Sequence, residues 1–133
     1  MSADLKAVES TFKALADATR LRILTLVVEG EVCVCEIHDS LRLPQPAVSR
    51  HLAYLRRTGL VEARREATWM HYRLAEVDPV IKGIVENAAH AMSHVTTSGR
   101  DRRRFEKGCG RSLPVVTAPH APCCAGERAE HQS

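Results

Sequence analysis

The sequence has little of what marks a secreted or membrane protein. No apolar run approaches the ~18 residues that a membrane span requires, so we expect no membrane partner. The first ten residues, MSADLKAVES, lack the basic and then apolar pattern of a secretory signal. We therefore expect a cytoplasmic protein, in which thiols stay reduced. Aromatic residues are also sparse, at 4% of the chain, so leucine, valine, isoleucine and alanine must form most of the core. At 133 residues we expect one domain that completes its burial by dimerising.

Cysteine is present, but not in the pattern of a disulfide framework. The five cysteines are Cys33, Cys35, Cys109, Cys123 and Cys124. In a reducing compartment such residues are better interpreted as metal ligands or reactive groups than as bridges. The first two stand one residue apart in the stretch EVCVCEIH, residues 31–38, beside a carboxylate and an imidazole. The pattern alone leaves a redox pair, a metal site and two small buried side chains as alternatives.

The net charge of +3 conceals an uneven distribution along the chain. Residues 1–41 carry four basic and seven acidic groups, whereas residues 42–73 carry seven arginines against Glu62 and Glu66. A basic block within a nearly neutral domain indicates a surface that binds a polyanion, although a merely solvated face has the same composition.

Apolar periodicity predicts a mainly α fold with a small β-hairpin. Helices are expected over residues 4–17, 18–30, about 33–41 and 44–58, with Asp17 or Thr19 as a cap and Gly30 and Gly59 as stops. Residues 60–74 alternate and predict two short antiparallel strands around a loop at 66–68, and residues 80–95 predict a closing helix. This order is typical of a winged helix-turn-helix. We assign residues 1–97 to that domain and expect residues 98–133 to form a disordered tail that contains cysteines.

The helix at 44–58 has the pattern of a recognition helix. Val48, Leu52 and Leu55 recur at helical spacing and must face the core, which turns Gln45, Ser49, Arg50 and Ala53 outward. Glutamine can pair with adenine, arginine with guanine, and serine with bases or phosphates, so this face suits the major groove of duplex DNA.

Further DNA contacts are expected around this helix. His51 lies at the border of the outward face and could reach a phosphate. Arg56 and Arg57, one or two turns later, are placed for contact with the DNA backbone, and Arg64 and Arg65 lie on the first strand of the wing, where a hairpin can reach the adjacent groove.

Four segments, ALADATRLRIL, EVCVCEI, QPAVSRHLAYLRRTGLV and WMHYRL, resemble in this order the ArsR/SmtB family of metal-sensing repressors, and within it the arsenic-responsive branch. The resemblance covers residues 5–97. It implies a homodimer joined through the first and last helices and bound to operator DNA. It also implies that arsenite or antimonite binds cysteine thiolates and releases the repressor from the operator.

The spacing of Cys33 and Cys35 predicts how such a release could work. On an ideal helix the two side chains point about 200° apart, so both can hold one ion only if the first helical turn opens. The third cysteine of the arsenic-responsive pattern is replaced here by His38. The sensor is therefore expected to contain Cys33, Cys35 and, as candidates, His38, Cys109, Cys123 or Cys124. Zinc, cadmium, lead or thiol oxidation remain alternative signals.

Two other functions are weighed against this one. Glu86, His90 and His94 are spaced four residues apart, but the spacing is better interpreted as a solvated stripe than as a second metal site. A small thiol reductase would need a Cys-x-x-Cys pair between a strand and a helix, whereas this chain has a single intervening residue, so we expect no enzyme.

Overall fold

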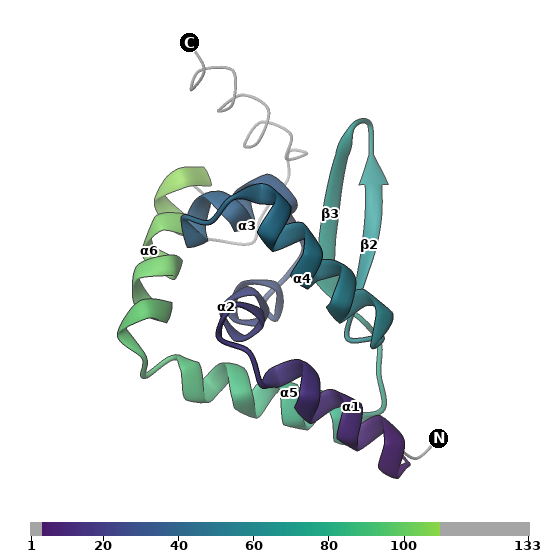
Figure 1. Ribbon diagram of the computed structural model, residues 1–133. Coiled ribbons are helices and arrows are strands. Elements are labelled where there is room, and N and C mark those ends of the chain that lie inside the picture. Colours follow the sequence, from purple (N-terminus) through teal and green to yellow (C-terminus); the bar gives the residue numbers. More distant parts are fainter. Residues whose placement is uncertain (1–3, 110–133) are drawn as a thin grey trace.

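The computed structural model describes residues 4–109, with side chains to residue 108. The described elements, in chain order, are α1 (Leu5–Leu15), α2 (Ala18–Val27), β1 (Val32–Cys33), α3 (Val34–Leu41), α4 (Gln45–Arg57), β2 (Val61–Glu66), β3 (Trp69–Leu74), α5 (Pro79–Met92) and α6 (Thr96–Cys109). In Figure 1, α2 lies at the centre, with α1 and α5 below it, α3 and α4 above, α6 on the left and the β2–β3 hairpin projecting on the right. This is a winged helix-turn-helix, as predicted.

Local sequence signals set the ends of several helices. Asp4, Asp17 and Asp78 are N-caps whose carboxylates accept hydrogen bonds from backbone N–H groups in the first turns of α1, α2 and α5. Asp17, one of the two predicted caps of the second helix, accepts from the N–H of Thr19 at 2.9 Å. Gly59 follows α4 with φ of +82°, a backbone conformation that favours glycine.

The core is built around α2 and the inner faces of α3 and α4. Val48, Leu52 and Leu55 of α4 are each 0% exposed, which confirms the predicted inward stripe. They pack in one cluster with buried aliphatic side chains of α2 and α3, including Ile23, Leu24, Val27, Ile37 and Leu41. The outer face of α4 is thereby fixed as the face turned to solvent.

The wing has one strand more than predicted. β2 and β3 pair antiparallel around a turn at 67–68, and the short strand β1 pairs antiparallel with the other edge of β3, which gives the order β1-β3-β2. Cys33 therefore belongs to the wing sheet and is not yet helical. A two-residue strand escapes detection by periodicity because its extended conformation comes from pairing with residues far along the chain.

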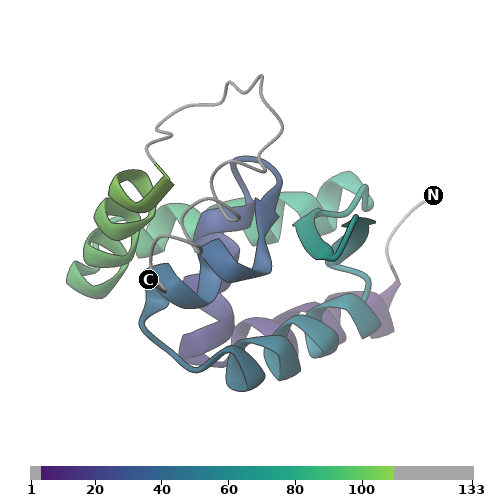
Figure 2. The same ribbon diagram turned by 90° about the horizontal axis from the view of Figure 1, so that it is seen from above.

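Residues 98–109 differ from the expected tail. They belong to α6, which packs on α3 and α2, so the prediction of disorder is wrong for this segment. Apolar periodicity does not reveal α6 because the face that packs against the protein is largely polar. Ser98 and Asp101 are buried on this face, and Phe105 is its one half-buried aromatic residue. Such a face gives no apolar period. Figure 2 shows α6 beside α3, on the opposite side of the molecule from the hairpin. The predicted tail residues 110–133 lie outside the described residues.

Candidate thiol site and nucleic-acid interface

The two cysteines of the EVCVCEIH stretch form a close thiol pair. Cys33 is the N-cap of α3 with extended backbone angles, φ of −77° and ψ of 145°, and Cys35 is the second residue of the helix. Their Sγ atoms lie 3.0 Å apart, well beyond the ~2.05 Å of a disulfide bond. Both side chains are buried, at 1% and 6% exposure.

This geometry shows that one expectation was wrong: the first turn of the helix does not have to open for both thiols to hold one ion. The divergence of about 200° applies only when both residues are helical, and Cys33 is extended. Because the backbone changes from strand to helix between the two cysteines, the sulfur atoms converge without any opening of the first turn. A ligand held by both thiols therefore does not need to unwind α3.

Two residues beside the pair were missed by the sequence analysis. The buried carboxylate of Glu36 accepts a hydrogen bond from the backbone N–H of Cys33 at 2.9 Å, which stabilises the start of α3. An acidic residue three positions after a helix N-cap is a signal that could have revealed it. His71, a buried residue of β3, is the direct cross-strand partner of Cys33. No local signal reveals this pairing, because 38 residues separate the two positions.

The described residues do not bring three metal-binding side chains together. Within residues 4–108, no group of three histidine, cysteine, aspartate or glutamate side chains is arranged to hold a metal ion. His38 is half-buried on α3, and its place in the sensor stays a prediction. The side chain of Cys109, at the end of α6, and both Cys123 and Cys124 lie outside the described residues. The pair itself supplies two soft sulfur donors, which suit a thiophilic ion.

The outer face of α4 has the expected exposure. Gln45, Arg50, Arg56 and Arg57 are exposed and Ser49 is half-buried, so polar groups line the side of the helix opposite its core stripe. Pro44 is the N-cap, and a proline at the start of α4 costs no hydrogen bond because the first turn has unpaired N–H groups in any case. Both ends of α4 are therefore accessible from solvent.

His51 is instead held against the protein. Its Nδ1 lies 3.3 Å from a terminal nitrogen of Arg20, and Arg20 also donates from Nε to the carbonyl of Ala14 at 2.7 Å and stacks 4.0 Å from the centre of the Tyr54 ring. Burial raises the pKa of Asp17, but hydrogen bonds from the N–H groups of Arg20 and Thr19 and the charges of His51 and Arg20 leave it lowered overall. The predicted phosphate contact of His51 stays a prediction. In the structure His51 joins α4 to the α1–α2 junction.

The two wing arginines have different surroundings. Arg64 donates to both oxygens of Glu31, at 2.9 and 2.7 Å, and to Glu66 at 2.8 Å. The pKa of Glu31 is lowered mainly by the hydrogen bond from Arg64, against the opposing effect of burial. Arg65 is exposed.

Arg65 lies on the other face of its strand, because side chains alternate along a strand. That face also carries Tyr72, the cross-strand partner of Ala63. Tyr72 is buried in one cluster with Leu52 and Leu55 of α4, and α4 packs against β2, so this face is turned towards α4. The charge of Arg56 on α4 accordingly opposes the rise that burial causes in the pKa of Tyr72. Arg65 therefore lies on the same side of the wing as α4.

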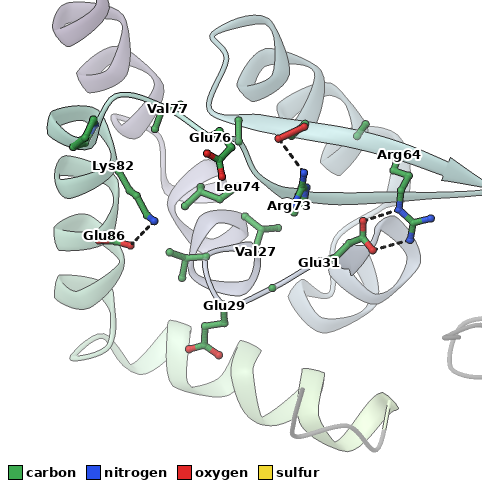
Figure 3. Close-up of a pocket in the computed structure, with 16 residues that line it drawn as sticks. Val27, Glu29, Glu31, Arg64, Arg73, Leu74, Glu76, Val77, Lys82 and Glu86 are labelled. Atoms are coloured by element: carbon green, nitrogen blue, oxygen red, sulfur yellow. Dashed lines mark hydrogen bonds and ion pairs between the residues drawn. The ribbon is translucent and has the colours of Figure 1, made fainter. Parts of the chain in front are cut away.

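A separate open groove of about 920 Å³ lies between the base of the wing, the α2–β1 loop and the start of α5. Figure 3 shows both acidic and basic side chains around it, among them Glu76, Arg73, Lys82 and Glu86. Neither Cys33 nor Cys35 lines the groove. Glu86, His90 and His94 of the expected solvated stripe are all exposed. No helix of the described residues is long and apolar enough to cross a membrane.

Comparison with known proteins gives a consistent set of similarities. A family model described as a bacterial regulatory protein, arsR family, matches residues 17–63. The arsenic resistance transcriptional regulator ArsR1 of Pseudomonas putida is 48% identical over 81 residues, and the match covers 56% of this chain and 63% of that protein. The chain thus spans less than two thirds of this relative.

Two solved structures share the fold. HlyU from Vibrio cholerae N16961 superposes with a TM-score of 0.62 at 34% identity, over 70% of this chain and 99% of that chain. The AntR antimony-specific transcriptional repressor gives a TM-score of 0.58 at 30% identity, over 71% and 84% of the two chains.

Proposed function

Since this chain belongs to the arsR family of bacterial regulatory proteins, a family of DNA-binding transcriptional regulators and not of enzymes, we propose that it is a repressor whose ligand is a thiophilic ion. The ligand we favour is trivalent arsenic or antimony, bound by Cys33 and Cys35. Ligand binding lowers the affinity for operator DNA and so releases transcription.

The observation that carries this proposal is the position of the thiol pair relative to the recognition helix. The two sulfur atoms meet at the first turn of α3, and α3 packs directly against α4. A ligand bound by both thiols therefore acts on the helix that supports the DNA-reading helix. Similarity to a regulator of arsenic resistance and to an antimony-specific repressor supports the choice of ion.

In the DNA-bound state, α4 lies in the major groove. Gln45 and Arg50, exposed in its amino-terminal half, read base edges, and Ser49 contacts a base or a phosphate. Arg56, Arg57 and the wing contact the phosphate backbone, which gives affinity for any duplex.

The chemistry of the ligand requires the two sulfurs to separate. Each thiol that binds arsenous acid displaces one hydroxide as water, so two sulfur–arsenic bonds form and two water molecules leave. With metal–sulfur bonds of about 2.3 Å and bond angles of roughly 100–110°, two sulfurs on one ion lie about 3.5–3.8 Å apart. The pair is at 3.0 Å, so binding pushes Cys33 and Cys35 apart by roughly half an ångström or more. A ligand shifts the DNA-binding equilibrium only because one state accommodates this separation better than the other.

Operator binding under arsenite titration tests the proposal. Anisotropy of a labelled operator duplex should fall as arsenite is added to the wild type. Proteins with Cys33→Ser or Cys35→Ser should bind the same duplex but resist release. Release of both serine proteins at the wild-type arsenite concentration would disprove the assignment of the trigger.

The same titration with other ions separates the related signals. Zinc, cadmium and lead are added in parallel, and thiolate–metal absorbance reports which of them bind the cysteines. Stronger release by zinc than by arsenite would replace the proposed ligand while leaving the thiol pair as the sensor.

Thiol oxidation is the second candidate signal, and the contact between the sulfurs favours it. Peroxide can convert two adjacent thiols to a disulfide with release of two water molecules, and the pair at 3.0 Å needs little movement to react. In this case peroxide alone releases the DNA, a reductant restores binding, and arsenite has no effect on the oxidised protein.

We also propose a homodimer formed through α1 and α5. Leu5 and Phe12 of α1 and Val80 of α5 are large apolar side chains at 83%, 55% and 57% exposure, and α1 packs against α5. Burying them against a second copy removes apolar surface from water. Phe12→Glu should shift the mass measured by light scattering towards that of a monomer, whereas an unchanged dimer would place the interface elsewhere.

A further inference from the structure

The wing sheet connects the thiol site to a wing arginine. In the register of the three strands, Cys33 of β1 lies opposite His71 of β3, and His71 lies opposite Arg64 of β2. Directly opposed residues of antiparallel strands share one face of the sheet. Cys33, His71 and Arg64 therefore form one row across the sheet, with the thiol at one end and the arginine at the other.

A second connection runs through Glu31, two residues before Cys33. Its carboxylate takes both hydrogen bonds of a fork-like contact from Arg64, at 2.9 and 2.7 Å, and Figure 3 shows the paired contacts. Glu66, at the far end of β2, binds a third nitrogen of the same guanidinium at 2.8 Å. Such bidentate contacts fix relative orientation as well as distance.

The short segment 31–33 is thus bound to the wing at both of its ends. Cys33 is held by backbone pairing with β3, and Glu31 is held by the side chain of Arg64 on β2. The contact between Glu31 and Arg64 spans the sheet, because β1 and β2 are its two opposite edges. A displacement of Cys33 therefore also acts on this ion pair.

We propose that Arg64 is a positioning residue that couples the thiol pair to the wing. The inference rests on the proposed function and adds the structural connection between ligand binding and DNA release. When the ligand separates the sulfur atoms, residues 31–33 and the wing move together, and the wing loses its contact with the DNA. Arg65, on the face turned towards α4, makes the wing's phosphate contact.

The test measures the coupling factor, the ratio of operator Kd with ligand to operator Kd without it. Couplings between two sites are typically about 5–150-fold. Glu31→Gln and Arg64→Gln should each reduce the factor to about 3-fold or less, with arsenite affinity, measured by thiolate absorbance, unchanged. Because the factor is a ratio, a general loss of DNA affinity cancels from it. Arg64→Lys, which keeps the cation but not the fork, should recover part of the coupling.

Glu62→Gln is the matched control. Glu62 of β2 pairs with Arg73 of β3 at 3.4 Å, so the substitution removes an exposed cross-strand ion pair of the same sheet and keeps Arg73, whose charge acts on Glu31. It should leave the coupling factor at the wild-type value.

The outcomes are distinct. A wild-type factor in the Glu31→Gln and Arg64→Gln proteins, with lower affinity for all duplexes in the latter, would make Arg64 a phosphate contact only and overturn the inference. Equal losses in the Glu62→Gln protein would also overturn it, because the loss of any ion pair of the wing would then reduce the coupling. Absence of release in the wild type itself would refute the proposed function and the inference together.

Discussion

Replacing Asp101 with asparagine tests the element that the sequence analysis missed. Asp101 is 0% exposed, and its carboxylate accepts hydrogen bonds from Arg22 at 2.8 and 2.9 Å and from Arg104 at 3.1 Å. The two arginines also donate to the backbone carbonyls of Leu41 and Ser40 at the end of α3. One carboxylate therefore fixes α6 to α2 and to the turn between α3 and α4.

The magnitude follows from the burial of the three charged groups. Removing one partner of a buried ion pair costs about 3–5 kcal/mol, because the remaining charge is left uncompensated. The side chains of Arg22 and Arg104 are 18% and 28% exposed, so water can solvate them in part. We therefore expect the lower limit, about 3 kcal/mol in the free energy of unfolding. At roughly 4 °C per kcal/mol for a domain of this size, the melting temperature should fall by about 12 °C.

Urea unfolding followed by circular dichroism measures the change. The control is Glu86→Gln, which breaks the exposed pair with Lys82 at 4.0 Å on α5 and should cost no more than about 0.5 kcal/mol. If Asp101→Asn were as mild as this control, residues 98–109 would not be packed as described, and the expectation of a tail beginning at Ser98 would stand after all.

Three further predictions concern DNA binding and the wing. Arg50→Ala should reduce discrimination between operator and random duplex by about 1–3 kcal/mol, and unchanged discrimination would show that another face of α4 enters the groove. Arg65→Gln should weaken binding to every duplex and lower the slope of log K against log salt by about 0.9, as for one lost phosphate contact, and an unchanged slope would exclude that contact. The pKa of Glu31 is lowered from 4.5 in the folded protein, so its ion pair with Arg64 stabilises the fold above that pH, and this stabilisation is lost as the pH falls through the folded pKa. The difference in unfolding free energy between wild type and Glu31→Gln should therefore shrink on acidification below about pH 4.5, and a difference that grows there would have the wrong sign for this pair.

Features set by neighbouring residues could be predicted well. Helix periods, the Asp17 cap and the stop at Gly59 depend on contacts within a few positions, so the order of α1 to α5 and the inward stripe of α4 follow from the sequence pattern. The exposure of Gln45 and Arg50 follows from the same stripe, because the opposite side of a helix buried on one face must meet solvent.

Composition and apolar periodicity were enough to predict the fold class, the outward polar face of α4 and the presence of a thiol pair. The arrangement of the pair could not be predicted in this way, because it depends on contacts between elements that are distant along the chain. Cys33 is extended because β1 pairs with β3, and this brings the two sulfurs together where an ideal helix would separate them. Likewise, Glu31, which binds Arg64, is 33 residues away from it in the chain, and Arg22, which binds Asp101, is 79 residues away. Contacts of that range depend on the packing of whole elements, and no local pattern encodes them.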